Sequence, residues 1–402
     1  MIGEINNEHT RQDIVDAQSL GLDAFALNFN QFATWSNNTV EFLFMNADNL
    51  GFGLFFSFDM APGYFTDPSQ YAGFLQQYMA RTSYYKYNGK PLVSTFGSEG
   101  VSNDQWASFK SAVGDVVIIP GFYQGISSDS LFSNRPILDG VFNWNSWSYP
   151  EAGKTAVSTA DDQAYMAAAR SAGKLFMMGM STLQFKHIDG SQNWYRRGEE
   201  NLEYRIGQVL EMQPDMLELQ TWNDAGESHY MGNIWDEPMT GSPIHTYVDG
   251  YSHTGYWQIL PAFIQAWKRG DTTTANILPT NGRAMQGAFW HHTLLVNADC
   301  GLDTMGKPQE IVNAEDAVSG VILVARGQSN LVGVVNVGQT ELGKLNLVEG
   351  YNKFKFGGLT AGKVTVEVWD GSTMIGGGYA PIEVSSSGST CNYNFQVVGF
   401  PS

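Results

Sequence analysis

The chain has 402 residues, of which 43% are hydrophobic and 15% are charged, and its formal net charge at pH 7 is −18. The length favours two domains, and the hydrophobic content excludes a disordered protein. The acidic balance argues against nucleic acid and anionic membranes as partners, and it suits a soluble protein that acts on a neutral substrate. We expect a monomer. Aromatic residues make up 13% of the chain. Such side chains stack on sugar rings, although a large aromatic core is the alternative explanation for most of them.

Neither the beginning of the chain nor its apolar runs carry a targeting or membrane signal. Residues 1–5 contain no basic region followed by an apolar core, so no signal peptide is predicted. No apolar run is as long as a membrane span requires.

Short apolar runs alternate with amphipathic stretches over the first 270 residues, a pattern typical of strands and helices around a parallel sheet. There are eight such runs, at residues 2–5, 24–29, 52–58, 92–96, 116–119, 140–144, 175–180 and 216–222. Helices are predicted at residues 11–20, 102–113, 161–172, 199–212 and 251–268. Eight strand–helix repeats in this length predict a (β/α)8 TIM-type barrel. A doubly wound sheet is the alternative, but its glycine-rich dinucleotide loop is missing after the first strand.

A polar, turn-rich stretch at residues 271–276 marks a predicted domain boundary. Beyond it, short alternating strands are predicted at residues 320–325, 331–337, 344–348, 353–356, 364–369 and 393–398. The sequence therefore predicts an α/β protein with a catalytic (β/α)8 barrel at residues 1–270 and an antiparallel β-sandwich accessory domain at residues 271–402. The triplet Gly376-Gly377-Gly378 lacks the Lys-Ser/Thr of a phosphate loop and is predicted to be a turn.

The eighth apolar run ends in two carboxylates, Asp224 and Glu227, with Trp222, His229 and Tyr230 beside them. Carboxylates directly after a buried strand are costly to desolvate unless they are paired, hydrogen-bonded or used. Cleavage of a glycosidic bond uses two acids: one protonates the leaving oxygen, and the other activates water or attacks directly. A helix N-terminus is the alternative, with Asp224 as the cap and Glu227 as its reciprocal partner. In a barrel, the position after a strand lies on the catalytic face.

The ends of the other predicted strands carry a chemically similar set of side chains. Amides, acids and aromatic rings prevail there, and basic groups are few. The set comprises Asn28, Asp59, Glu99, Tyr123, Gln124, Trp144, Asn145, Trp147, Gln184 and Trp194. Because the carboxyl ends of barrel strands meet on one face, we expect these side chains to line one cleft. For each residue taken singly, a place in the core is the alternative.

The residue patterns of metal sites, serine nucleophiles and catalytic thiols are missing from the sequence. The histidines are scattered, and the adjacent His291 and His292 cannot put both side chains on one helical face, so no metal site is predicted. No Gly-x-Ser-x-Gly motif follows a strand, and no cofactor is predicted. Cys300 and Cys391 both lie outside the barrel, which argues against thiol catalysis. They could form one disulfide, and two free thiols are the alternative.

Long, ordered motifs are spread along the predicted barrel. They are Trp222-Asn223-Asp224-Ala225-Gly226-Glu227-Ser228-His229-Tyr230, residues 23–28, 54–60 and 93–97, and Asn193-Trp194 with Arg197-Gly198. In these motifs the chain resembles glycoside hydrolase family 71, the fungal α-1,3-glucanases or mutanases. The resemblance implies endo-hydrolysis of α-1,3-glucan with inversion at the anomeric carbon and without a cofactor.

The paired acids of that family correspond to Asp224 and Glu227. We assign Glu227 as the general acid and Asp224 as the base that activates water, and the reverse assignment is the alternative. Inversion requires the two carboxyl groups to lie about 6.5–9.5 Å apart, and the acid needs a raised pKa. The expected sugar-binding residues are Asn28, Asp59, Glu99, Trp144, Trp194, Trp222, His229 and Tyr230.

The resemblance also implies a place outside the cell or in the cell wall. The chain begins inside what should be the first strand and carries no secretion signal, so we interpret it as lacking upstream residues. Three competing hypotheses use the same cleft. They are a barrel glycosidase for another glucan linkage, a non-catalytic cell-wall protein that binds glucan, and a transglycosylase.

Overall fold

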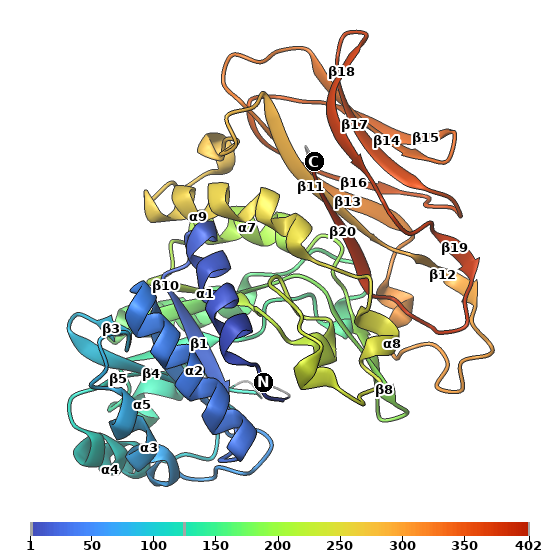
Figure 1. The fold of residues 1–402 in the computed structure, drawn as a ribbon. Helices are drawn as coiled ribbons and strands as arrows, with labels where there is room; N and C mark the ends of the chain where they lie inside the picture. Colours follow the sequence, from blue (N-terminus) through green and yellow to red (C-terminus); the bar gives the residue numbers. More distant parts are fainter. Residues whose placement is uncertain (1–2, 124–125, 401–402) are drawn as a thin grey trace.

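Parallel β-strands form the central part of the chain, and the computed structural model describes residues 3–123 and 126–400 (Figure 1). The strands are β1 (Ala24–Phe29), β2 (Gly53–Asp59), β4 (Lys90–Phe96), β5 (Val117–Pro120), β6 (Gly140–Asn143), β7 (Leu175–Ser181) and β10 (Met216–Gln220). β1, β2, β4 and β5 pair in that order, and β6, β7 and β10 pair as a second group. The bridge between Gly121 and Phe142 joins the two groups. Because all these pairings are parallel, the carboxyl ends of the strands lie on one side.

The predicted strand at residues 2–5 does not form in the described chain. Gly3 to Ile5 adopt no strand, and Met1 and Ile2 lie outside the described residues. Here the backbone N–H of Ile5 donates to the Thr39 hydroxyl at 3.0 Å, so this group bonds a side chain and not a strand. Within the described residues, β1 therefore pairs only with β2, and β10 pairs only with β7.

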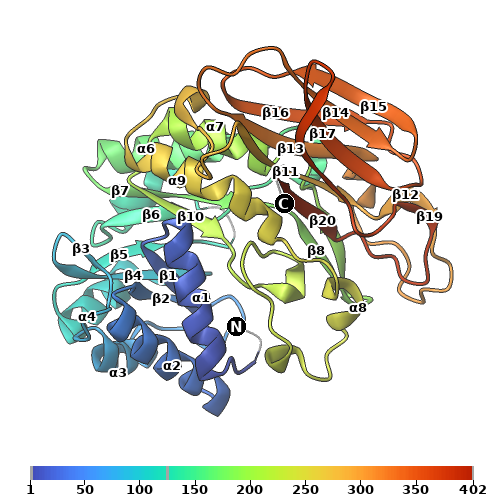
Figure 2. The same cartoon turned by 45° about the horizontal axis from the view of Figure 1, so that its top comes forward.

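Helices follow the strands and lie outside them (Figure 2). They are α1 (Asn7–Leu20), α2 (Thr34–Leu50), α3 (Ser69–Tyr78), α4 (Asn103–Val113), α5 (Leu131–Asn134), α6 (Ala160–Ser171), α7 (Leu202–Met212), α8 (His245–Val248) and α9 (Leu260–Lys268). The boundaries follow local chemistry: Ser102 and Gln105 form the reciprocal cap of α4, and Gly21, at a φ of 91°, ends α1.

The predicted helix at residues 251–268 is divided in the structure. A 3₁₀ turn at Thr254–Gln258 precedes α9, which has Pro261 in its first turn. Proline has no backbone N–H to donate to the preceding turn, so it is tolerated only where an α-helix begins.

Two antiparallel sheets occupy the C-terminal part of the chain. The first has the order β16 (Gly350–Gly357), β13 (Ala317–Val324), β11 (Met285–His292) and β20 (Phe395–Phe400). The second has the order β15 (Thr340–Asn346), β14 (Leu331–Val337), β17 (Val364–Asp370) and β18 (Thr373–Tyr379). Shorter strands are β3 (Lys86–Tyr87), the hairpin β8 (Gln184–Asp189) and β9 (Gln192–Arg196), and the pair β12 (Leu294–Asp299) and β19 (Ser385–Ser387).

The glycine triplet is a strand and not the predicted turn. Gly376, Gly377 and Gly378 lie in β18 and pair with β17. A Cβ atom on Gly377 would lie 2.3 Å from the carbonyl oxygen of Val366, and one on Gly376 would lie 2.7 Å from the sulfur of Met285. The glycines therefore allow a close approach of the backbone to its neighbours, a role that composition alone does not distinguish from a turn.

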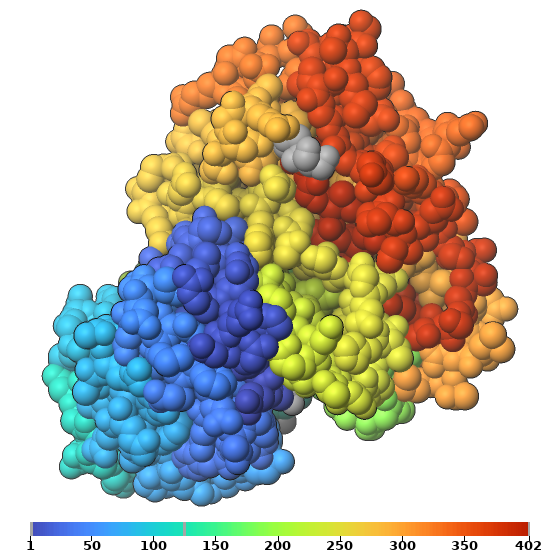
Figure 3. Space-filling model, viewed as in Figure 1, coloured from blue at the N-terminus to red at the C-terminus, as the bar shows by residue number. Residues whose placement is uncertain are grey.

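The first antiparallel sheet contributes to two hydrophobic cores because its side chains alternate between its faces. Trp290 and Leu323 join the core of the parallel strands, while Phe289 and Ile322 pack in a second core with side chains of the other sheet, such as Val366. Figure 3 shows the C-terminal residues, orange to red, at one end of the molecule and the N-terminal residues, blue to cyan, at the other. None of the helices in the described ranges has the length and the apolar character needed to cross a bilayer.

Candidate active site

A cavity of about 1020 Å³ opens at the carboxyl ends of the parallel strands. It continues between β1 and β10 toward their amino ends. At the carboxyl ends of the strands its wall contains acids, amides and aromatic rings, as the strand ends predict, together with two basic side chains. These residues are Asn28, Asp59, Phe96, Tyr123, Trp144, Asn145, Trp147, Tyr149, Gln184, Lys186, Trp194, Arg196, Trp222, Asn223, Asp224 and Glu227.

The segment after β10 turns tightly and carries both expected catalytic acids. The hydroxyl of Thr221 accepts from the backbone N–H of Asp224 at 3.0 Å, and Asp224 Oδ1 accepts from the backbone N–H of Glu227 at 3.2 Å. Asp224 thus caps a 3₁₀ turn over Ala225–Glu227, as the alternative interpretation of the motif predicts. The reciprocal half of that interpretation is wrong, because the carboxylate of Glu227 bonds side chains of β8 instead.

Glu227 is held by two side chains of β8. Lys186 Nζ lies 3.4 Å from its Oε1, and Gln184 Nε2 donates to its Oε2 at 3.3 Å. The guanidinium of Arg196 donates to Gln184 Oε1 at 2.8 Å, which fixes the amide with its NH2 group toward Glu227. Glu227 therefore faces a cation and an amide donor.

The environment of Asp224 favours the protonated, neutral form of its carboxyl group. Its burial raises the pKa of its carboxyl group to about 7, and the charge of Glu227 adds to the effect. The charge of Lys186 acts against the rise. Near neutral pH, Asp224 therefore retains its proton in a large fraction of molecules.

A third acid, Asp59, lies at the end of β2 in the same cavity. Burial is the main cause that raises its pKa, and the charge of Glu227 contributes. The backbone N–H of Ala61 and the side chain of Asn28 donate to its carboxyl group and oppose the rise. Asn28 and Asp59 thus form one polar pair on the wall of the cavity.

Aromatic rings form the remaining walls. Trp144 packs against Phe96 with 4.8 Å between the ring centres. The guanidinium of Arg196 lies between Trp147 and Trp194, 4.3 Å and 4.8 Å from their ring centres. Trp144, Trp147 and Trp194 therefore contribute aromatic rings to a cavity that also contains carboxyl groups, and Arg196 covers one face of each of the last two rings.

Trp222 also lines the cavity, and a glycine is required beneath it. Its ring centre lies 5.2 Å from that of Phe25 and 6.0 Å from that of Trp257. A Cβ atom on Gly232 would lie 2.3 Å from the indole carbons. Any side chain at position 232 would therefore displace this ring.

Two expected sugar-binding residues, His229 and Tyr230, lie behind the cavity and not on its wall. The bridge between Asp224 and His229 closes the turn, so the chain returns to the core at His229. The ring of His229 is fully buried between Gln184 and Ser181, and burial lowers its pKa to about 3. Tyr230 is also fully buried and donates to the carbonyl oxygen of Tyr251 at 2.5 Å. Both therefore support the turn, and we expect no sugar contact from either.

Two further expected residues do not contribute to the described cavity wall. Glu99 follows β4, its backbone carbonyl accepts from Arg135 at 2.7 Å, and its side chain is not among those that line the cavity. Gln124 lies outside the described residues.

Lys186 and Arg196 are functional candidates that the sequence-based interpretation missed. Both project from the hairpin β8–β9, whose two strands are not among those predicted from the sequence. The sequence signal for the hairpin is the pair Asp189-Gly190, which begins the turn between the two strands.

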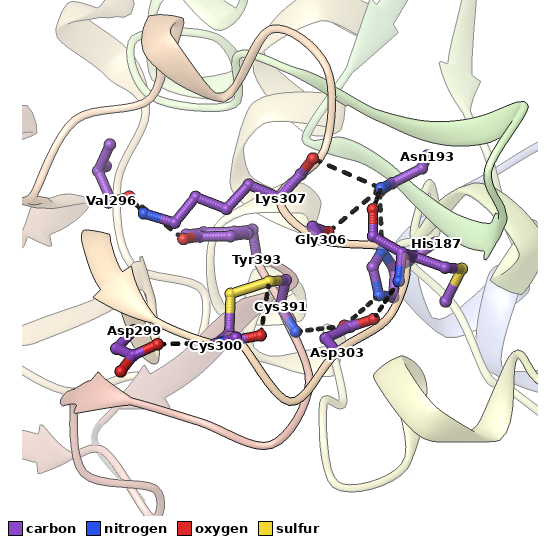
Figure 4. Close-up of a disulfide and its surroundings, with 12 residues drawn as sticks. His187, Asn193, Val296, Asp299, Cys300, Asp303, Gly306, Lys307, Cys391 and Tyr393 are labelled. Carbon is purple, nitrogen blue, oxygen red and sulfur yellow. Dashed lines mark hydrogen bonds and ion pairs between the residues drawn. A yellow bond between two sulfur atoms is a disulfide. The ribbon is translucent and has the colours of Figure 1, made fainter.

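Residues of the C-terminal part contact this hairpin and hold it in place (Figure 4). The ring of His187 is fully buried, with Nδ1 2.8 Å from Asn193 Oδ1 and Nε2 2.7 Å from Asp303 Oδ2. Asp303 also accepts from the backbone N–H of Cys391 at 2.7 Å, and Cys391 forms a disulfide with Cys300. The disulfide therefore closes the loop that fixes Asp303 against the hairpin near its turn.

Replacing Cys300 and Cys391 together by serine is expected to lower the free energy of unfolding by about 4 kcal/mol, because the bridge spans 91 residues of sequence and restricts the unfolded chain. Urea denaturation of the variant and of the wild type at one pH measures the difference. The wild type in reductant serves as the matched control and should lose the same amount. Identical midpoints for all three samples would refute a stabilising role for the bridge.

The parts of the chain that the structure describes contain no group of three or more His, Cys, Asp and Glu side chains placed to hold a metal ion.

Comparison with known proteins relates the chain to one family of glycosyl hydrolases. The model of glycosyl hydrolase family 71 matches residues 1–402. An ascus wall endo-1,3-alpha-glucanase of Schizosaccharomyces pombe is 28% identical over 405 residues, which cover 96% of this chain and 91% of that protein. A glucan endo-1,3-alpha-glucosidase of the same organism is 33% identical over 64% of this chain and 62% of its own length. A mutanase of Penicillium rubens is 26% identical over 81% of this chain and 70% of its own length.

Among solved structures, an endo-alpha-mannosidase of family GH99 from Bacteroides thetaiotaomicron has a similar fold. Its TM-score is 0.51 at 15% sequence identity, over 66% of this chain and 86% of that chain. At this identity the likeness concerns the fold alone.

Proposed function

Because the chain belongs to glycosyl hydrolase family 71, we propose that this glycoside hydrolase cleaves α-1,3-glucosidic bonds within the α-1,3-glucan of fungal cell walls. The observation that carries the proposal is the pair Asp224 and Glu227, held next to each other in an aromatic cavity at the carboxyl ends of parallel strands. The linkage and the endo mode of cleavage are supported by the relatives from Schizosaccharomyces pombe, an endo-1,3-alpha-glucanase and a glucan endo-1,3-alpha-glucosidase.

We propose a (β/α)8 barrel at residues 1–270 and a β-sandwich accessory domain at residues 271–402 as the architecture. The parallel strands with their outer helices and the similar fold of a family GH99 enzyme support the barrel. The second hydrophobic core, which both antiparallel sheets share, supports the sandwich.

In the proposed reaction Asp224 is the general acid and Glu227 is the general base, the reverse of the assignment favoured from the sequence. Asp224 has the raised pKa that an acid needs, whereas Glu227 faces Lys186 and the amide of Gln184. Asp224 gives its proton to the glycosidic oxygen as the bond to the anomeric carbon breaks. Glu227 takes a proton from the water that attacks the opposite face, and the configuration inverts.

The walls of the cavity supply the proposed glucan contacts. Trp144, Trp194 and Trp222 offer flat faces on which glucosyl rings stack. The pair Asn28 and Asp59 offers hydrogen bonds to hydroxyl groups. No cofactor takes part in this scheme. The ascus wall enzyme among the relatives supports a place outside the cell or in the cell wall, and we propose a monomer.

The rate is expected to fall about tenfold per pH unit above pH 7, since the acid Asp224 must carry a proton and its pKa is about 7. The charge of Lys186 lowers that pKa, so Lys186→Met should move the alkaline limb to higher pH. The pH dependence of kcat for both proteins tests this. A limb that stays in place in the variant, or that moves to lower pH, would contradict the proposed electrostatics.

A panel of polysaccharides tests the substrate. Purified protein is incubated separately with α-1,3-, α-1,4- and β-1,3-glucan, and the lengths of the products are followed with time. The proposal expects oligosaccharides of mixed length from α-1,3-glucan alone, because an endo enzyme cuts within the chain. Release only from another linkage would support the competing glycosidase, and binding without release would support the wall-binding protein. Products longer than the substrate would reveal a transglycosylase.

A further inference from the structure

Four side chains form a hydrogen-bond network that leads from the cavity into the core behind the catalytic pair. The network begins at Arg196 and Gln184 on the hairpin β8–β9, and it continues through the ring of His229 to Ser181 on β7. Gln184, His229 and Ser181 are buried. Because buried polar groups need partners, each bond of the network restricts the direction of the next one.

The side-chain amide of Gln184 has only one orientation that satisfies its neighbours. Its Oε1 accepts from the guanidinium of Arg196 at 2.8 Å, and a guanidinium has no lone pair that could accept from an NH2 group. The NH2 group therefore points the other way. One of its N–H groups donates to Glu227 Oε2 at 3.3 Å, and the other reaches His229 Nδ1 at 3.1 Å. Both donors of the amide thus have partners.

The orientation of this amide determines which nitrogen of His229 carries the proton. Burial, together with the charge of Arg196, lowers the pKa of the ring to about 3, so the ring is neutral near pH 7. Nδ1 faces an N–H donor, so Nδ1 is the acceptor and the proton lies on Nε2. Nε2 then donates to the hydroxyl of Ser181 at 2.9 Å, and Ser181 donates to Gln220 Oε1 at 3.1 Å.

The backbone and the ring of His229 have separate roles. Its backbone N–H donates to the carbonyl oxygen of Asp224 at 3.0 Å, and its carbonyl oxygen accepts from the hydroxyl of Thr221, so the backbone closes the turn. A substitution at position 229 retains these backbone groups. The ring bonds Gln184 instead. A change of ring atoms therefore acts on the amide of Gln184, while the bonds that close the turn are kept.

We propose that His229 is a positioning residue for the general base, because its Nδ1 holds the amide of Gln184 in the orientation that donates to Glu227. The inference rests on the proposed function, in which Glu227 takes a proton from the attacking water. Without the acceptor at Nδ1, one N–H of a buried amide loses its partner, and the amide turns away from Glu227 to regain one. A displacement of about 1 Å in a catalytic group can cost about 10²-fold in rate.

Two replacements of similar shape separate the two nitrogens of the ring. The side-chain oxygen of asparagine takes the place of Nδ1 as an acceptor, and the side-chain nitrogen of glutamine takes the place of Nε2 as a donor. His229→Gln is expected to lower kcat at least about tenfold on α-1,3-glucan, with KM changed less than about twofold. The same loss is expected on an α-1,3-linked oligosaccharyl fluoride, whose leaving group needs no proton. His229→Asn should restore kcat to within about threefold of the wild type on both substrates.

Equal losses in the two folded variants would overturn the proposal, because both lack the ring and only one lacks the acceptor. A loss on the glucan without a loss on the fluoride would also overturn it, since this result would place the damage at the acid Asp224. Circular dichroism establishes that both variants are folded. Glu227→Gln separates this inference from the proposed function. Full activity of Glu227→Gln on the fluoride would remove the base itself, whereas its inactivity beside a fully active His229→Gln would overturn the positioning role alone.

The ¹⁵N NMR signals of the His229 ring test the proposal in the wild type, and they decide it if His229→Gln does not fold. The signals are identified in protein labelled at histidine by their absence from His229→Asn. A protonated Nε2 and an unprotonated Nδ1 are expected at pH 7. A proton on Nδ1 would overturn the proposal, because that nitrogen could not accept from Gln184.

Discussion

Replacing Asp224 by asparagine is expected to lower kcat on α-1,3-glucan by about 10²- to 10⁴-fold, the contribution of a positioned general acid. The amide has no proton to give to the leaving oxygen, although its shape and its acceptor for the N–H of Glu227 are retained. Initial rates of oligosaccharide release from the variant and the wild type measure the loss. The exposed Glu211 provides a matched control, and Glu211→Gln should leave the rate unchanged.

A second substrate separates the acid role from a general loss of function. An α-1,3-linked oligosaccharyl fluoride has a leaving group that departs without protonation, so Asp224→Asn should hydrolyse it nearly as fast as the wild type does. Equal losses on the fluoride and on the glucan would remove Asp224 from the acid role. The variant should also be at least as stable as the wild type at pH 7. The folded-state pKa of Asp224 is raised from 3.8 to about 7, so ionisation of this group destabilises the fold as pH rises through that window.

Glu227→Gln is expected to cause a loss of similar size, about 10²- to 10⁴-fold, on both the glucan and the fluoride. Without the carboxylate, no group in the proposed scheme takes the proton from the attacking water, whatever the leaving group. Removing this negative charge should also lower the pKa of Asp224, because the charge of Glu227 is one of the causes that raise it.

Two measurements check the Glu227 prediction independently. Rates on the fluoride report the base role, and a ¹³C NMR titration of the Asp224 carboxyl carbon reports the change in its pKa. Full activity of the variant on the fluoride would reverse the two assignments. A pKa that stays at its wild-type value would show that the two carboxyl groups do not interact.

The sequence predicts most of the element order, because the spacing of apolar residues and the residues that cap helices are local properties of the sequence. Seven apolar runs become parallel strands, and the reciprocal cap at Ser102 and Gln105 begins α4 as its pattern indicates. Tertiary contacts overrule local signals elsewhere. Gly376 to Gly378 form a strand because close neighbours leave no space for side chains, and the predicted first strand forms no ladder in the described residues.

The candidate site was predictable in kind but not in detail. Asp59, Trp144, Asp224 and Glu227 line one cavity because they follow parallel strands, whose carboxyl ends share one side. The direction of each side chain after a strand end depends on the turn, so proximity in sequence misplaced His229, which lies behind the cavity.

The electrostatics of the acid pair depend on contacts distant in sequence. Lys186, which bonds Glu227, is 41 residues away along the chain, and no spacing rule links the two. The hairpin that carries Lys186 is fixed in turn by Asp303, 116 residues after its partner His187. The choice between acid and base therefore requires the folded structure.

Hydrolysis of α-1,3-glucan by the wild type and by the double variant Asp224→Asn, Glu227→Gln tests the central claim most directly. Both proteins are incubated with the polysaccharide at pH 6, and the released oligosaccharides are followed with time. The account predicts oligosaccharides from the wild type alone, with the variant folded and still bound to the glucan. Release by the double variant at the rate of the wild type would contradict the assignment of these two carboxyl groups as the catalytic pair.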